Sequence, residues 1–203
     1  MAHDKNRPNE QHTICSGIDP VGNHDVFDME SFLKKHSNQS CIPSPAVKKS
    51  EKICSDAEEI TDIYDRVKYL SSTCIRLLKT LSETFEAGFG SERSEFVKKQ
   101  FMYTYDVYIE VSSYLVSTVM EDSTGCMECP DDFPDTVTDS VLIYDLPDRF
   151  RCTAVLLNYM RSKLHLRNFS CLSYCAGVLF AMDLKTMAVL HDFCYLPLGA
   201  EDP

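Results

Sequence analysis

Apolar residues recur at helical spacing through most of the chain beyond residue 55. The longest series alternates steps of three and four residues, which places its members on one face of a helix. It comprises Ile60, Ile63, Val67, Leu70, Cys74, Leu77 and Leu81, with Tyr64, Leu78 and Phe85 beside them. Because the stripe is this wide, it favours a seam within a helical bundle over an intermolecular coiled coil. Ser55 and Glu58 have the spacing of a capping box and predict the start of this helix.

Start signals divide the rest of the chain into further helices. Ser91 predicts the start of a second helix, joined to the first by a turn short enough for an antiparallel hairpin. Asp145 and Pro147 predict the start of a third helix, and Asn168 or Ser170 the start of a fourth. The fourth is apolar on most sides, which predicts a central place in the core.

Two segments are less clearly helical. Residues 140–144 are β-prone and fit a short strand or a buried extended segment, while residues 184–195 fit a fifth helix or a strand pair, with the helix favoured. The predicted fold class is therefore mostly α, a single bundle of four to five helices over residues 55–198. An acidic loop at residues 121–140 separates the second helix from the third.

The first 54 residues are polar and lack a long apolar period, which predicts a flexible tail. Within this tail, residues 25–36 fit a short amphipathic helix that docks in a partner's groove or folds back on its own domain. For the docking interpretation, the predicted contact residues are Phe27, Met29, Phe32 and Leu33.

Tyrosines offer a second candidate binding face. Four of them lie within twelve residues of the second helix, more than one buried stripe can accommodate, so some must reach the surface. Tyr103 and Tyr105 are the predicted binding residues. The alternative is that they lie at a bundle edge without any partner.

The formal net charge of −11 argues against nucleic acid as a partner, because no basic stripe offsets it. Residues 121–140 carry seven of the acidic residues and no Lys or Arg, which indicates a solvated loop or a surface for a basic partner. The longest uncharged run in the C-terminal half is too short and polar to predict membrane insertion. The N-terminus has no secretory pattern, so we expect an intracellular protein, cytoplasmic or nuclear.

Ten cysteines in a reducing compartment are expected to be free thiols. Cys126 and Cys129 form the one CxxC, which can hold zinc only with two further ligands. Cys171 and Cys175 could supply these ligands if the acidic loop folded onto the fourth helix. No cofactor is predicted.

Little in the sequence indicates catalysis. His165 and His191 are the histidines of the predicted domain and have structural explanations, and the seven glycines form no phosphate-binding loop. The sequence thus predicts a non-catalytic protein interaction module, an adaptor or complex subunit. Self-association of the chain is a further interpretation. The alternative is a small zinc-stabilised or metal-assisted enzyme domain that uses the CxxC. Ser44, followed by Pro45, is a predicted phosphorylation site for a proline-directed kinase.

Overall fold

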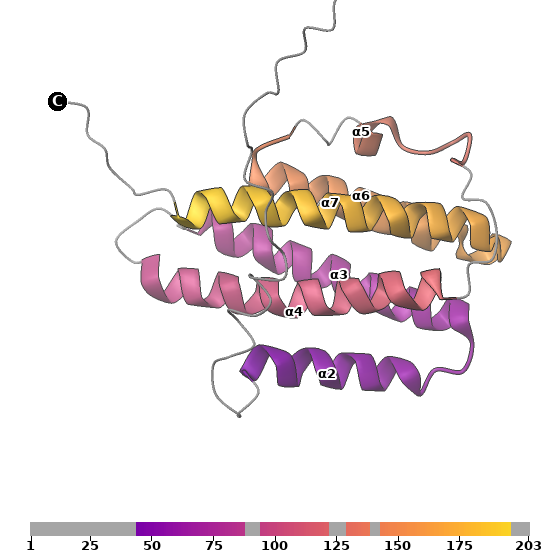
Figure 1. Cartoon of the computed structure of the whole chain (residues 1–203), viewed down its shortest axis with the longest axis horizontal. Helices are drawn as coiled ribbons and strands as arrows, with labels where there is room; N and C mark the ends of the chain where they lie inside the picture. The colour runs from indigo at the N-terminus through magenta and orange to yellow at the C-terminus, as the bar shows by residue number, and fades with distance from the viewer. Residues whose placement is uncertain (1–43, 88–93, 122–128, 139–142, 196–203) are drawn as a thin grey trace, which may run out of the picture. The chain divides into compact units, whose positions relative to one another are not determined.

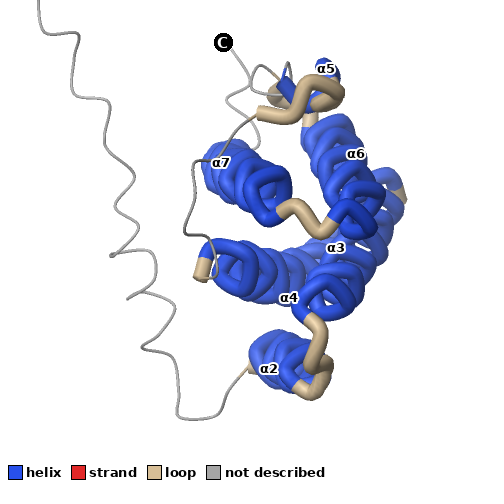
Figure 2. The backbone as a smooth tube through the Cα atoms, turned by 90° about the vertical axis from the view of Figure 1, so that its right-hand side faces the viewer, coloured by secondary structure: helices blue, strands red, loops and turns tan. Residues whose placement is uncertain are grey.

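The structure is a computed structural model that describes residues 44–87, 94–121, 129–138 and 143–195, with side chains placed up to residue 191. These residues contain helices and no strand, which confirms the mostly helical prediction. Helices α3 (Ile63–Glu86), α4 (Ser94–Met120), α6 (Leu146–Lys163) and α7 (Phe169–Tyr195) pack lengthwise, as Figures 1 and 2 show. The short helix α5 (Asp135–Thr138) lies on α6, and a 3-10 turn, η2 (Leu164–Leu166), follows α6.

Helices α3 and α4 form the predicted antiparallel hairpin. Phe85, in the last turn of α3, contacts Phe101 in the first half of α4, with ring centroids 6.1 Å apart. The apolar stripe of α3 is buried against α4 and α6; its fully buried members are Val67, Leu70, Cys74 and Leu81. The stripe is therefore used within the chain and is not available for a coiled coil with a second copy.

Among the described residues, the first helix begins ten residues before the predicted boundary at residue 55. Helix α2 (Pro45–Glu58) starts at the cap Ser44, with Pro45 in its first turn, and it packs mainly on α4. Ser55 and Glu58 lie in its last turns, so the predicted capping box is wrong. The cap of α3 is Asp62 instead, whose carboxylate accepts from the backbone N–H groups of Tyr64 and Asp65 at 2.9 and 3.1 Å.

The later start signals are confirmed. Asp145 caps α6 by accepting from the backbone N–H of Asp148 at 3.1 Å, and the Asn168 side chain accepts from the backbone N–H of Cys171 at 3.3 Å at the start of α7. Of the β-prone segment, only residues 143 and 144 are described, and they are not in a strand. The predicted starts at Ser91 and within residues 1–43 lie outside the described residues.

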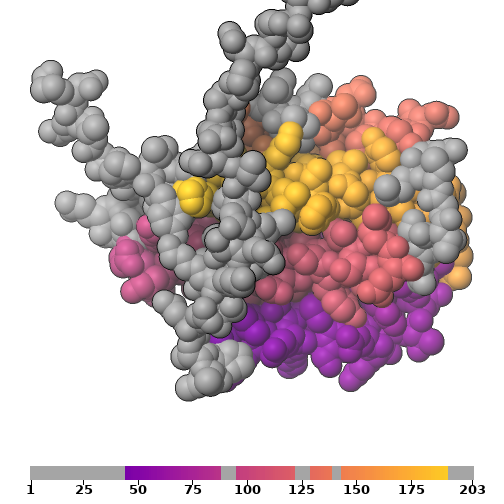
Figure 3. Space-filling model, viewed as in Figure 1, coloured from indigo at the N-terminus to yellow at the C-terminus, as the bar shows by residue number. Residues whose placement is uncertain are grey.

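Helix α7 differs from the prediction in two ways. It continues without a break to Tyr195, so residues 184–195 belong to the fourth helix and form no fifth one. It is also not central, because it packs on α4 and α6 while its other side contributes to the surface seen in Figure 3. Phe180 on that side is 48% exposed. The wide apolar surface of α7 is thus divided between the core and the outside.

Candidate functional site

An open groove lies between the N-terminal end of α2 and the first half of α4, and we call it the α2–α4 groove. Ser44 caps α2 at one end of it, with its Oγ accepting from the backbone N–H of Val47 at 3.3 Å. Half-buried Tyr103 of α4 also lines it. The other lining residues are Pro45, Ala46, Met102, two lysines and two carboxylates, Lys98, Lys99, Glu95 and Asp106. The structure therefore brings together two residues that the sequence singled out separately, the predicted phosphorylation site and a predicted binding tyrosine.

Tyr105, the other predicted binding tyrosine, is only 6% exposed. Its ring stacks on Phe101 with centroids 6.4 Å apart, and its hydroxyl has no hydrogen-bond partner among the described residues. Burial raises the pKa of this hydroxyl far above its usual value. Tyr105 offers a partner no exposed surface, so we remove it from the predicted binding face and keep Tyr103.

A second open groove, the α2–α3 groove, lies on the other flank of α2. Ile53 of α2, Tyr69 and Leu77 of α3 form its apolar part. Its charged lining residues are Lys49, Lys52, Asp56 and Arg76. The four predicted contact residues of the tail, Phe27, Met29, Phe32 and Leu33, lie outside the described residues, so the structure does not place them against either groove.

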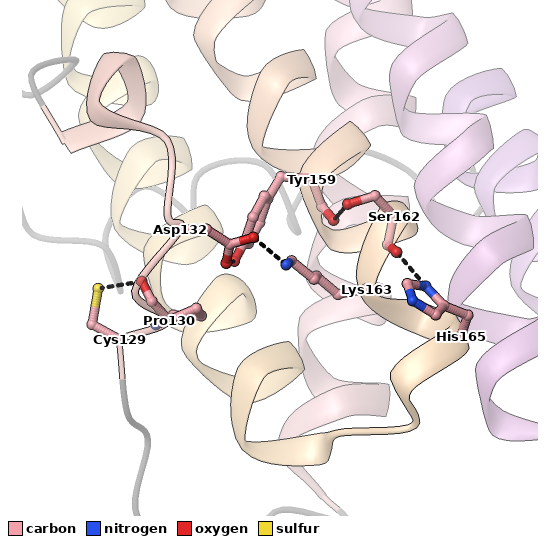
Figure 4. A network of polar contacts seen from close by, with 7 residues as sticks. All are labelled: Cys129, Pro130, Asp132, Tyr159, Ser162, Lys163 and His165. Carbon is pink, nitrogen blue, oxygen red and sulfur yellow. Dashed lines mark hydrogen bonds and ion pairs between the residues drawn. The ribbon is translucent and has the colours of Figure 1, made fainter.

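The acidic stretch is partly docked on the helices, contrary to the expectation of a solvated loop. Asp132 accepts hydrogen bonds from the Lys163 ammonium and, at 2.8 Å, from the Tyr159 hydroxyl (Figure 4). These hydrogen bonds, chiefly that of Lys163, hold the pKa of Asp132 below its ordinary value. The ring of Phe133 packs edge-on against Tyr159 and Tyr174, at centroid distances of 5.4 and 5.1 Å. Residues 129–138 thus tie the stretch to α6 and α7.

This docking brings the exposed Cys129 to the first turns of α7. The hydrogen bond that the Tyr174 hydroxyl donates to Cys129 raises the pKa of that hydroxyl, and Cys129 adds to the rise in the pKa of Cys175, which burial causes in the first place. Cys171 lies one helical turn from Cys175 and also has a raised pKa, chiefly through burial. Cys129 is thus near the helix end that carries Cys171 and Cys175, but no three metal-ligating side chains converge among the described residues. Cys126 lies outside them.

The two histidines keep structural explanations. His165 lies at the end of α6, where its Nδ1 is 2.6 Å from the carbonyl oxygen of Ser162 (Figure 4). His191 lies on the exposed surface near the end of α7.

A buried polar cluster joins α4, α6 and α7. Asp183 of α7 accepts hydrogen bonds from the hydroxyls of Tyr108, at 2.7 Å, and Ser112, at 2.5 Å. Arg149 of α6 lies near it and donates to the Thr186 hydroxyl at 3.0 Å and to the Met182 carbonyl at 3.2 Å. Burial raises the pKa of Asp183 to about 6, and the two hydroxyl donors and Arg149 oppose the rise.

Sequence analysis did not identify this cluster as a site. Asp183 is the one acidic residue between Phe169 and His191, in an otherwise apolar run. A lone carboxylate in such a run signals a buried polar partner, because an unpaired charge in a core is costly. The sequence does not name the partners, since Tyr108 and Ser112 lie 75 and 71 residues away along the chain.

One helix in the described part of the chain, Phe169–His191, is long and apolar enough to cross a membrane, with a mean hydropathy of 1.3. Core helices of water-soluble proteins meet the same criterion, so this is weak support for membrane insertion.

Comparison with known proteins adds no relative: no family model, curated protein or solved structure matches this chain.

Proposed function

We propose that this chain is a non-catalytic protein interaction module that acts as an adaptor or subunit of an intracellular complex. The observation that carries the proposal is the placement of α2. This helix packs mainly on α4, at the outside of the α3, α4, α6 and α7 arrangement (Figure 2). One open groove lies at its N-terminal end, against α4, and another along its side facing α3. Grooves between helices, lined by apolar, aromatic and charged side chains, are surfaces into which protein partners insert helices or extended segments.

Two contact regions are proposed. One is the amphipathic segment at residues 25–36 of the tail, with Phe32 and Leu33 as its central apolar residues. The other is the α2–α4 groove, where Tyr103 adds a ring with a polar tip, as is common at interfaces. Phe96, in the first turn of α4, is 78% exposed.

Phosphorylation of Ser44 is the proposed regulation of this second region. A phosphate adds up to about two negative charges, which the N-terminal end of a helix favours. Ser44 is exposed and its backbone is extended (φ −57°, ψ 153°). Lys98 and Lys99 line the same groove together with Glu95, which pairs with Lys99 at 3.7 Å, and Asp106. Modification there would change the charge of the α2–α4 groove and hence its choice of partner.

The test is partner capture from native cells with the full chain and with matched variants. Phe32→Ala combined with Leu33→Ala is expected to abolish capture and leave the melting temperature unchanged. Lys34→Ala combined with Lys35→Ala changes the same segment but keeps its apolar residues, and it serves as the control. Equal recovery of the same partner by the wild type and the Phe32/Leu33 variant would refute docking through the tail.

A zinc-stabilised or metal-assisted domain is the second candidate. It is favoured by the contact of Cys129 with the first turns of α7, which carry Cys171 and Cys175. Together with Cys126, these thiols would make a four-cysteine set, the composition of many structural zinc sites. Metal analysis of untagged protein discriminates between the two candidates. The second expects one zinc per chain, lost in Cys129→Ser and in Cys171→Ser, whereas the interaction module expects no stoichiometric metal.

A further inference from the structure

The α2–α3 groove exists because α2 packs mainly on α4 and much less on α3 (Figure 2). The residues that line it on α3 run from Tyr69 to Thr80. At the rise of an α-helix this length is about 16 Å, or roughly three turns. The groove therefore has the length to receive a short helix laid between α2 and α3.

The floor of the groove is apolar and its rim is mostly basic. Ile53 is buried, at 8% exposed, whereas Tyr69 and Leu77 are half-buried and leave part of their apolar surface open to the groove. Exposed Lys49 and Lys52 of α2 stand on one rim and exposed Arg76 of α3 on the other.

The rim of the groove is positively charged, whereas the chain as a whole is negatively charged. The chain carries a formal net charge of −11, yet this groove has three cations and one carboxylate, that of Asp56. Lys49 and Lys52 form no ion pair with a described residue, and Arg76 donates to the Thr73 hydroxyl at 3.0 Å, which directs its guanidinium. Basic side chains that flank an apolar floor complement a helix with apolar residues on one face and carboxylates on either side of it.

We propose that the α2–α3 groove binds an acidic amphipathic helix of a protein partner. The apolar face of that helix covers Tyr69 and Leu77 beside the buried Ile53. Its Asp or Glu side chains pair with Lys49, Lys52 and Arg76. The proposal rests on the proposed function as an interaction module, and it adds the chemistry of the partner and a surface other than the tail and the α2–α4 groove.

Fluorescence anisotropy with the full chain tests the proposal. The probe is a labelled synthetic helix of about 14 residues with Leu and Phe at positions i, i+3, i+4 and i+7 and Glu beside them. A second probe has Lys in place of each Glu. We expect the acidic probe to bind and the basic probe not to bind. Lys49→Glu combined with Lys52→Glu should weaken binding of the acidic probe by about tenfold or more, because two basic side chains that attract its Glu residues become acidic ones that repel them.

The matched control changes the same charge on the opposite flank of α2. Lys98→Glu combined with Lys99→Glu alters the net charge by the same amount, but these two residues line the α2–α4 groove. Equal weakening by both double variants, or no binding of the acidic probe to the wild type, overturns the proposal. So does a dimer that light scattering detects for the wild type and not for the Lys49/Lys52 variant, because the groove would then hold a second copy.

Failure of the groove proposal can be distinguished from failure of the proposed function. A native partner that the Lys49/Lys52 variant retains, and that the Phe32/Leu33 variant loses, removes the groove proposal and leaves the interaction module in place. No native partner for any version of the chain removes the proposed function itself.

Discussion

Replacement of Asp183 by Asn should change how the stability of the protein depends on pH. The Asp183 carboxyl is buried and accepts hydrogen bonds from Tyr108 and Ser112 of α4. Cys74 of α3 and Arg149 of α6 also act on this cluster electrostatically. An Asn at this position keeps one of the two acceptor oxygens, places an amide NH2 in place of the other, and cannot become charged.

The sign follows from the direction of the pKa shift. Burial raises the pKa of Asp183 from 3.8 to about 6 in the folded protein, so between these values the folded state holds a proton that the unfolded state has lost. Stability therefore falls as the pH rises from about 4 to about 6. At about 1.4 kcal/mol for each pH unit between the two pKa values, the charged carboxylate costs about 3 kcal/mol at neutral pH.

Denaturant unfolding at a series of pH values from about 4 to about 7 measures this effect. The free energy of unfolding of Asp183→Asn, minus that of the wild type, should rise by about 3 kcal/mol across the series. Glu51→Gln, an exposed carboxylate on α2, is the control and should show no such rise. A flat difference, or one that falls with pH, would refute the reasoning, because it would mean that Arg149 compensates the charge fully.

Three further outcomes are expected. Ser44→Ala should destabilise α2 by about 0.5–2 kcal/mol through loss of its cap, with faster hydrogen exchange in α2, while Ser55→Ala, in the same helix, should change little. Phe133→Ala should cost about 1–3 kcal/mol and open residues 129–138 to proteolysis, whereas Phe96→Ala should do neither; equal losses would contradict the docked segment. Alkylation followed by mass spectrometry should modify exposed Cys129 before the buried thiols of α3 and α7, and the reverse order would contradict their burial.

The sequence predicts the helices well where local chemistry decides. The cap Asp145 followed by Pro147 starts α6, and Asn168 starts α7, because a cap satisfies backbone N–H groups within three residues of itself. Ser55 and Glu58 satisfy the same local rule and are nevertheless in the last turns of α2. The helix had already begun at Ser44 and Pro45, and the burial of Ile53 and Ala57 against the rest of the protein holds those turns helical.

The candidate sites depend on contacts that no local pattern specifies. Tyr103 and Tyr105 are two residues apart on α4, yet the first lines a groove and the second is in the core. The amphipathic pattern of α4 is broad enough to allow either. The α2–α3 groove likewise arises from the way α2 leans on α4, which is a property of packing between helices and not of either helix alone.

The central claim is that this chain works inside a protein complex, and its mass in a native extract tests this most directly. The chain itself has a mass of 23.1 kDa. Size-exclusion chromatography with mass spectrometry, on chain produced at its native level, should place it in a larger assembly with a stoichiometric protein partner. Elution at the mass of the single chain, with no co-eluting partner, would contradict the claim.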